Sequence, residues 1–300
     1  TALFIAIRTH RQRKILSFLI QLGSRLDEAD KIGSSPLMIA AETKNYKAFR
    51  FLLDFHPDLN FKNRNNDTPL ILAAKSNDTN MVKLLLSELD NLKTLKVNEQ
   101  NNDGDSAFSI AVKNNNHEMI YNLAINGADT NVINNKKETP LFIALQSNNE
   151  KTISLLLSLQ DDINHLDINH ETPLIITLKA HNYSIAKKLL MKDADITIRD
   201  NDFKTPLMIA ACDKNGVINV LLEREADPNL QDAEGNTALH YAAFKGNKAI
   251  IEALVKYKAN MEIQNSNHET PIMVACRYQK NDAVKLLLTL GASTLFVDNY

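Results

Sequence analysis

Cysteine is nearly absent from this 300-residue sequence, and the two that occur, Cys212 and Cys276, cannot form a disulfide framework. Such sparse cysteine fits a reducing compartment, so we expect a cytoplasmic location. No apolar run reaches the roughly 18 residues that a membrane-spanning helix needs, and no signal-peptide pattern opens the chain. We therefore expect no insertion into a membrane.

An excess of charge of one sign is also missing, because 34 Lys and Arg residues face 36 Asp and Glu residues. This balance argues against a nucleic-acid partner held by the overall field, and leaves room only for a local basic patch. The hydrophobic fraction of 44% and the charged fraction of 23% are those of ordinary globular proteins. Disorder over the whole length is therefore not expected.

Recognised catalytic and cofactor motifs are missing as well. The sequence contains no Walker loop, no G-x-G-x-x-G fingerprint and no nucleophile elbow. His165 and His170 lie close together in the sequence, but no ligand set around them has the spacing of a metal site. We expect Cys276 to be packed in the core and Cys212 to be more exposed, with no fixed base beside it. The sequence thus predicts no catalytic residue, no cofactor, no metal and no enzyme activity.

What the sequence does contain is an internal repeat. A four-residue pattern close to Thr-Pro-Leu-x recurs nine times, with successive spacings of 34, 33, 38, 33, 33, 33, 32 and 33 residues. Thr or Ser before Pro is typical of a helix start, since the hydroxyl caps free N–H groups and Pro suits the first helical position. The copies begin at Thr1, Ser35, Thr68, Ser106, Thr139, Thr172, Thr205, Thr237 and Thr270.

The rest of each copy predicts a second helix and a turn. The first helix contains small pairs such as Ala73-Ala74, which let neighbouring helices approach closely, and the second contains aliphatic triplets such as 84–86. Segments rich in Asn, Asp and Gly, such as 101–105, then suit left-handed and turn conformations. The sequence therefore predicts that each unit consists of a helix, a turn, a second helix and a hairpin-like finger.

The period of about 33 residues and the T-P-L-H-x-A core resemble the ankyrin-repeat family over nearly the whole chain. The resemblance implies an all-α solenoid of stacked helix-turn-helix units with short fingers, here a single domain over 1–300. Both ends look cut from a longer polypeptide. The spacing of 38 indicates an insertion near 89–97, which extends the second helix or forms an exposed loop.

Departures from the family pattern concern a histidine and a glycine. The family's histidine after Thr-Pro-Leu is kept only at His240, so the other repeats lose a polar link between neighbours. The glycine usual after the second helix is kept in three repeats, and other residues replace it at His56, Gln160, Asp193, Glu225 and Lys258. A residue with a Cβ in a left-handed cap costs about 1 kcal/mol, so we expect a less stable array than a consensus one.

Family members usually bind partner proteins on the concave palm, which the first helices line, and on the fingers. Counting seven residues from each Thr or Ser gives a broken basic ladder that could steer an acidic segment of a partner. The alternative is a row of solvated helix ends, where cations suit the helix dipole. The ladder consists of Arg8, Lys75, Lys113, Lys179, Lys245 and Arg277.

A second candidate site is aromatic. Phe244 and Lys245 precede Arg277 and Tyr278 by one repeat, and Phe203 occupies the glycine position of its finger. Exposed aromatics near Arg resemble a binding hot spot, although such rings also serve to pack neighbouring repeats. Acidic residues that precede the Thr or Ser, such as Asp67 and Glu269, suit a helix N-terminus or an acidic recognition edge.

The sequence thus favours a non-catalytic scaffold that binds another protein through its palm and fingers. Two alternatives stay open. One is a targeting or autoinhibitory module of a larger enzyme or bacterial effector, which would act in the host cytoplasm in the latter case. The other is a structural spacer that binds nothing specific.

Overall fold

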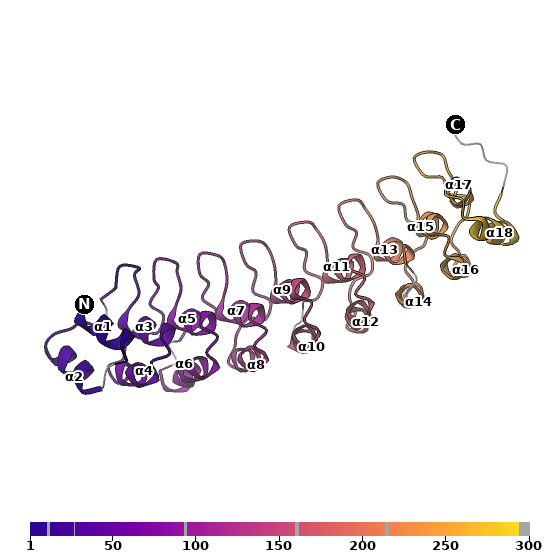
Figure 1. Ribbon diagram of the computed structural model, residues 1–300. Coiled ribbons are helices and arrows are strands. Elements are labelled where there is room, and N and C mark those ends of the chain that lie inside the picture. Colours follow the sequence, from indigo (N-terminus) through magenta and orange to yellow (C-terminus); the bar gives the residue numbers. More distant parts are fainter. Residues whose placement is uncertain (11–12, 27, 93–94, 160–161, 214–215, 294–300) are drawn as a thin grey trace. The chain divides into compact units, whose positions relative to one another are not determined.

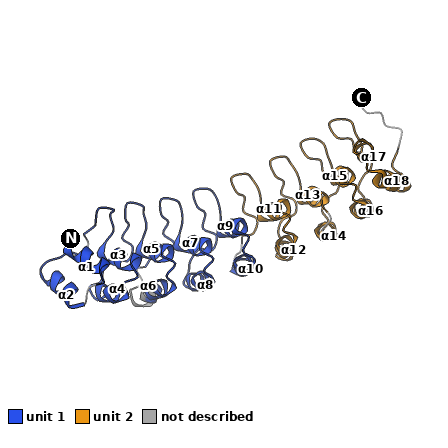
Figure 2. Ribbon diagram, viewed as in Figure 1, with its two compact units in different colours: residues 1–161 blue, residues 162–300 orange. Residues whose placement is uncertain are grey.

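The computed structural model describes residues 1–10, 13–26, 28–92, 95–159, 162–213 and 216–293. Within them the regular secondary structure is α-helical, and the extended pairing is a single isolated bridge between Gln100 and Ser106. The predicted all-α fold class is confirmed. The chain divides into two compact units, Thr1–Asp161 and Asp162–Tyr300 (Figure 2). The organisation of all repeats as one domain stays a prediction.

Both units are built from helix pairs, with odd-numbered first helices and even-numbered second helices. Unit 1 contains α1 (Ala2–Arg8), α2 (Arg13–Gln21), α3 (Pro36–Glu42), α4 (Tyr46–Leu53), α5 (Pro69–Lys75), α6 (Thr79–Leu92), α7 (Ala107–Lys113), α8 (His117–Ile125), α9 (Pro140–Ser147) and α10 (Glu150–Leu159). Unit 2 contains α11 (Pro173–Lys179), α12 (Tyr183–Met191), α13 (Pro206–Ala211), α14 (Val217–Glu223), α15 (Ala238–Lys245), α16 (Lys248–Lys256), α17 (Pro271–Arg277) and α18 (Asn281–Thr289).

Within each unit the first helices pack side by side in one layer and the second helices form another (Figure 1). The segment between a second helix and the next first helix projects as a finger from the layer of first helices. Small residues of the first helices, such as Ala40, Ala73, Ala111 and Ala211, are fully buried between neighbours. Their size lets adjacent helices approach closely, as the sequence predicts.

The first helices begin where the hydroxyl residues predict. Five of these residues accept a hydrogen bond from the backbone N–H three residues ahead, at 3.2–3.3 Å. This contact satisfies one of the N–H groups that lack a partner at the start of a helix. The five are Ser35, Thr68, Ser106, Thr172 and Thr205.

Each finger closes around one Asp or Asn side chain, which we call the finger Asx residue. Its Oδ1 accepts backbone N–H groups two and four residues ahead, as Asn63 does from Asn65 and Asp67 at 2.9 Å each. This bond pattern holds the turn without help from a β-sheet. The finger Asx residues are Asp30, Asn63, Asn101, Asn134, Asp167, Asp200, Asp232 and Asn265.

The other polar atom of the finger Asx side chain, Oδ2 of Asp or Nδ2 of Asn, complements the polar group that faces it. Where that neighbour is a cation or a donor, the residue is Asp: Asp30 accepts from Arg8 and Asp232 accepts from Tyr241. Asp200 forms an ion pair with Lys179. Where the neighbour is an acceptor, the residue is Asn: Asn101, Asn134 and Asn265 donate to Asp67, Glu138 and Asn236, in that order.

The insertion lies at the second helix of its repeat. Helix α6 has 14 residues, compared with 8 in α4 and 9 in α8, and Leu95 and Val97 after it are buried. Extra residues therefore lengthen α6, while residues 93–94 of the predicted insertion lie outside the described part of the chain. A functional role of this segment stays untested.

The residues that replace glycine after the second helices adopt the left-handed conformation. The φ angles of His56, Asp193, Glu225 and Lys258 lie between 51° and 66°. Gln160 lies outside the described residues. At Gly127, which keeps the glycine, an added Cβ would meet no atom within 4 Å, so the penalty at such positions is one of backbone conformation and not of space.

Replacing one such residue by glycine should therefore stabilise the protein. We expect Lys258→Gly to raise the free energy of unfolding by about 1 kcal/mol. In the control, Glu252→Gly in the exposed face of α16, glycine enters a right-handed helix and should lower that free energy by about 1 kcal/mol. Urea denaturation followed by circular dichroism measures both, and a loss of stability in Lys258→Gly would contradict the argument.

Candidate functional site

Charged residues eight positions apart face each other within four of the repeats. The residue before the Thr or Ser contributes a carboxylate, and the residue at the end of the first helix contributes a cation. We call these contacts the intra-repeat pairs. They are Asp67–Lys75 at 2.6 Å, Asp105–Lys113 at 2.5 Å, Glu171–Lys179 at 2.5 Å and Glu269–Arg277 at 2.7 Å. In a neutral version, Gln146 donates to Glu138 at 2.7 Å.

The carboxylates of the intra-repeat pairs are the buried partners. The side chains of Asp67, Asp105 and Glu269 are only 3%, 8% and 5% exposed, which removes them from most of the water that would otherwise solvate them. A buried charge without a partner is strongly destabilising. The cations are thus structural counter-ions of the fingers.

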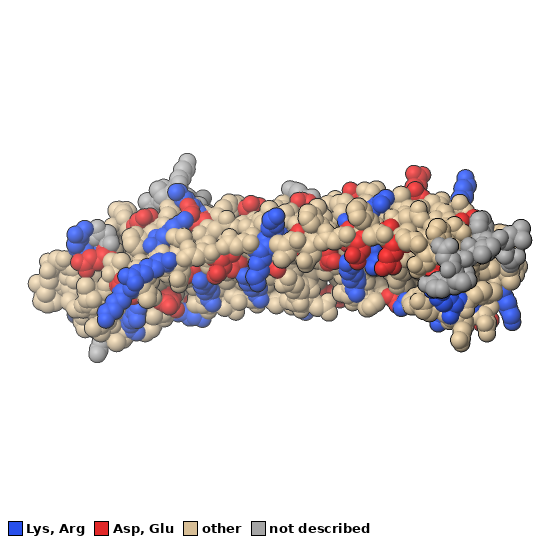
Figure 3. All heavy atoms as spheres, turned by 90° about the horizontal axis from the view of Figure 1, so that it is seen from above, with Lys and Arg blue, Asp and Glu red and all other residues tan. Residues whose placement is uncertain are grey.

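This pairing changes the interpretation of the basic ladder. Lys75, Lys113, Lys179 and Arg277 belong to intra-repeat pairs, and Arg8 contacts Asp30 at 2.9 Å. Figure 3 shows the result on the finger side, where Lys and Arg lie among Asp and Glu and form no block of one sign. In the described part of the chain, Lys245 is the ladder residue without a carboxylate partner.

Lys179 has two carboxylate partners. Its Nζ lies 2.5 Å from Glu171 and 2.7 Å from Asp200 of the next finger, so it joins two repeats. Burial lowers the pKa of Lys179, but the hydrogen bonds to Asp200 and Glu171 outweigh burial and raise the pKa above its ordinary value. The ammonium therefore stays charged and engaged at neutral pH.

Two consecutive repeats of unit 2 lack the intra-repeat pair. The two positions hold Lys204 and Cys212 in one repeat, and Asn236 and Phe244 in the next. A cleft of about 400 Å³ lies at this point, lined by residues of the fingers and of the ends of α13, α15 and α17. We call it the aromatic cleft. Its lining includes Cys212, Asn236, Tyr241, Phe244, Lys245, Arg277 and Tyr278.

Aromatic rings form the exposed wall of the aromatic cleft. The rings of Phe244 and Tyr278 meet edge to face, with centroids 4.5 Å apart and planes at 84°. Lys245 places its Nζ 5.7 Å from the Phe244 centroid. Phe244 remains 37% exposed and Tyr278 remains 49% exposed, so their mutual contact leaves much of both rings in water.

The structure thus brings together four of the predicted site residues, Phe244, Lys245, Arg277 and Tyr278. Phe203 is 58% exposed and has the left-handed φ of 61° that its glycine position predicts, but it is not part of the cleft lining. Lys75 and Lys113 lie in unit 1, whereas the aromatic cleft belongs to unit 2.

Tyr241 and His240 fix the base of the aromatic cleft. The Tyr241 hydroxyl donates to the Asp232 carboxylate, and burial together with this hydrogen bond raises the pKa of Tyr241. Nδ1 of His240 accepts from the Thr237 N–H at 3.1 Å, so its Nε2 donates to the Glu269 carbonyl at 3.0 Å. This bond between repeats is the polar link that the sequence predicts for the retained histidine, and burial keeps the ring neutral by lowering its pKa.

The two cysteines differ from expectation. Cys276 is exposed and Cys212 is half-buried, which is the reverse of the predicted order. Cys276 is exposed because, in the described part of the chain, no further first helix packs against α17. Burial raises the pKa of the Cys212 thiol, which disfavours the nucleophilic thiolate. Across the residues that the structure covers, no three His, Cys, Asp or Glu side chains gather as a metal site. None of the described helices has the length and apolar character to cross a bilayer.

The helix pairs, the fingers and the period of the repeat agree with one family description, "Ankyrin repeats (3 copies)". Its overlapping matches cover residues 1–63, 37–134, 108–200 and 207–298. The chain belongs to the ankyrin-repeat family. Ankyrin-repeat domains are generally protein-interaction modules and are typically non-catalytic.

Similar proteins come from several sources. An ankyrin repeat protein of Acanthamoeba polyphaga mimivirus is 29% identical over 134 residues, which cover 41% of this chain and 18% of the relative. One from Rickettsia bellii is 37% identical over 84 residues, which cover 27% of this chain and 50% of the relative. The matched part of the chain thus spans at most half the length of either ankyrin-repeat relative.

A solved structure agrees with the fold. The ankyrin repeat domain of Bcl-3 superimposes with a TM-score of 0.63 at 22% identity, covering 74% of this chain and 98% of that domain. At this identity the likeness establishes the ankyrin fold alone.

Sequence reasoning missed the carboxylate partners of the basic ladder and the polar lining of the aromatic cleft, including Tyr241 and Asn236. One signal was present. In the printed sequence, a cation eight residues after an acidic residue recurs in four repeats, and both are missing together at positions 204 and 212 and at 236 and 244. Paired loss of this kind indicates that the two positions touch.

Removing the cation of an intra-repeat pair should destabilise the fold more than removing a surface cation. Lys75→Met leaves the Asp67 carboxylate buried, and we expect it to lower the free energy of unfolding by about 1–3 kcal/mol. Lys83→Met removes the partner of Glu118, whose side chain is 62% exposed, and should cost under about 1 kcal/mol. Urea unfolding compares the two variants, and equal losses would show that the buried carboxylate does not depend on Lys75.

Proposed function

We propose that this ankyrin-repeat domain is a non-catalytic module that binds a partner protein through the aromatic cleft of unit 2. The observation that supports the proposal is the exposed Phe244–Tyr278 pair, which occurs where two consecutive repeats lack the intra-repeat ion pair. Exposed rings beside a cleft lose water when a partner covers them, and such rings often dominate binding energy.

The lining of the aromatic cleft suits a mixed apolar and acidic segment. Phe244 and Tyr278 offer ring faces and edges to an apolar side chain. Lys245 has no carboxylate partner in the described part of the chain, so its ammonium is available to a carboxylate of the partner. Arg277 is held by Glu269, and its role at this site is to support the α17 end and the finger.

The structure therefore sharpens the choice of variant for a binding experiment. Replacing Arg277 would leave Glu269 buried without a partner, so a variant that includes it would mix lost binding with lost stability. Phe244→Ala/Lys245→Ala/Tyr278→Ala removes the exposed contacts and keeps the intra-repeat pair. We expect this variant to fold normally.

A matched control exists in the same repeat. Lys256 and Tyr257 at the end of α16 form a similar cation–ring contact at 5.9 Å, and Tyr257 is 37% exposed, as Phe244 is. Lys256→Ala/Tyr257→Ala therefore removes the same kinds of atoms from the second-helix side.

The measurement is an affinity pull-down with the native chain, the triple variant and the control, followed by mass spectrometry and titration of each captured protein. We expect a partner that binds the native chain and the control alike and binds the triple variant at least about tenfold more weakly, as loss of two aromatic hot-spot residues implies. A partner retained equally by all three baits would contradict the aromatic cleft as its site. Absence of any partner for a folded bait would favour a structural spacer.

A further inference from the structure

Two consecutive second helices of unit 2, α16 and α18, begin without the side-chain cap that the preceding described starts possess. In the preceding repeats, Asn or Asp accepts the backbone N–H three residues ahead at 3.0–3.2 Å. These capping residues are Asn45, Asp78, Asn116, Asn149 and Asn182. The corresponding residues before α16 and α18 are Asn247 and Lys280, and neither caps with its side chain. The corresponding residue before α14 lies outside the described part of the chain.

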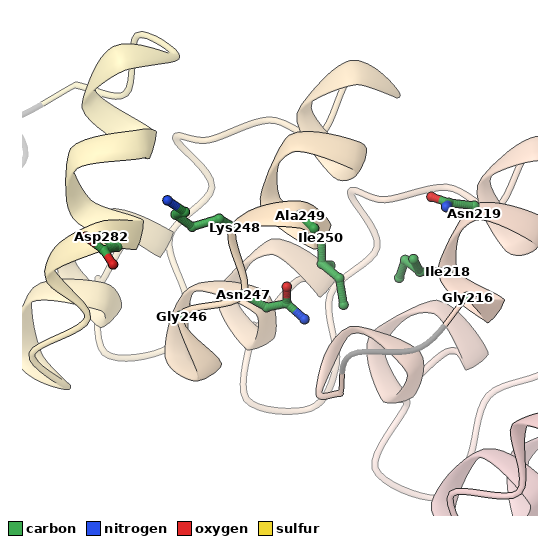
Figure 4. A pocket seen from close by; sticks show the side chains of 9 residues that line it. All are labelled: Gly216, Ile218, Asn219, Gly246, Asn247, Lys248, Ala249, Ile250 and Asp282. Carbon is green, nitrogen blue, oxygen red and sulfur yellow. The ribbon is translucent and has the colours of Figure 1, made fainter.

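A pocket of about 560 Å³ lies at these helix starts (Figure 4). Its lining includes Gly216, Asn247, Lys248 and Asp282, and it shares no residue with the aromatic cleft. The first three residues of the nine-residue helix α16 line this pocket, so the partial positive charge of the helix N-terminus faces it.

Asn247 is the decisive residue of the pocket. It is only 5% exposed, yet among the described residues its carboxamide has no hydrogen-bond partner. Figure 4 shows the carboxamide beside Ile250, directed from the start of α16 toward the Gly216–Ile218 side. Asn247 lines the pocket, so a ligand there would meet a carboxamide whose donor and acceptor positions no described protein group fills.

One lysine, Lys248, lines this pocket, and two others lie against glycines of its lining. The Nζ of Lys187 lies 3.1 Å from the point where a Cβ on Gly216 would stand, so the ammonium rests against the start of α14. Lys248 is the first residue of α16, and the Lys280 side chain packs on Gly246. In the described part of the chain these three lysines have no carboxylate within ion-pair distance, and Asp282 is the one acidic residue of the lining. Figure 4 shows Asp282 well apart from the Asn247 carboxamide.

We propose that this pocket binds an anion of the phosphate class. The N–H groups of the first turn of α16 and the Asn247 amide would donate hydrogen bonds to its oxygens, and Lys187 would balance its charge. Backbone N–H groups at a helix start, combined with nearby cations, are a recurring way to hold such an anion. The inference is independent of the proposed partner-binding role of the aromatic cleft.

The test is a titration of the ¹⁵N-labelled chain with inorganic phosphate, against sodium chloride at matched ionic strength. We expect saturable shifts of the Lys248, Ala249 and Ile250 amide signals with phosphate and not with chloride. A second arm uses a short phosphoserine peptide. Shifts with both probes would show that a phosphorylated protein segment can occupy the pocket, and shifts with inorganic phosphate alone would restrict it to small anions.

Two variants and a control assign the binding to this pocket. Lys187→Ala/Lys248→Ala removes one cation from α12 and one from the start of α16, and we expect about tenfold weaker phosphate binding. Lys192→Ala/Lys256→Ala removes the same charges from the other ends of those helices and should bind as the native chain does. Asn247→Asp places a good N-cap and a negative charge in the pocket, so the fold should be kept and binding lost.

A loss of binding can be distinguished from a loss of folding, because the amide spectrum of each ¹⁵N-labelled variant shows whether it is folded. Saturable shifts that Asn247→Asp and Lys187→Ala/Lys248→Ala weaken, while the control keeps them, establish the anion site. The absence of shifts with both probes overturns the proposal. Shifts that persist in Asn247→Asp, or that both lysine pairs weaken equally, also overturn it by showing diffuse attraction to lysines.

Discussion

Each repeat of this chain depends on its neighbours to bury the apolar face of its first helix. Within each unit, Ala-rich first helices pack directly on one another, and residues such as Ala73 and Ala74 are completely buried. A helix of seven or eight residues has too little surface to form a core alone. The fold is therefore held by contacts between successive repeats, as in other solenoids.

Close stacking of this kind also buries polar groups, and the repeats satisfy them by one recurring scheme. Finger Asx residues hold the turns, intra-repeat pairs neutralise buried carboxylates, and Asn or Asp caps the second helices. Both candidate sites of unit 2 occur where this scheme is interrupted. The aromatic cleft lies where the ion pair is missing, and the pocket at the start of α16 lies where the side-chain caps are missing. Interruptions in the regular array thus leave side chains and backbone groups without the partners that they have in the other repeats.

Most of the fold could be predicted from the sequence, because the period, the Thr-Pro helix starts and the apolar residues are local signals. The left-handed conformation of Lys258 follows from its place in the repeat in the same way. Side-chain partners could not be predicted so directly. The ladder position of Lys75 is visible in the sequence, but its buried partner Asp67 depends on how the finger folds back over the helix end. Exposure of Cys276 likewise depends on whether another first helix packs against α17.

The finger Asx residues carry a consequence for chemical ageing. Asn101 and Asn134 donate their amide hydrogens to the carboxylates of Asp67 and Glu138, whereas a cation or hydroxyl faces the Asp that holds this position in three other fingers. Slow deamidation turns an asparagine into an acid, which would set two carboxylates against each other at these two fingers. The fingers of Asp30 and Asp232, already acidic, have no such reaction to undergo. Storage or long cellular lifetime would therefore loosen the fingers of unit 1 at Asn101 and Asn134 before it affected those built on aspartate.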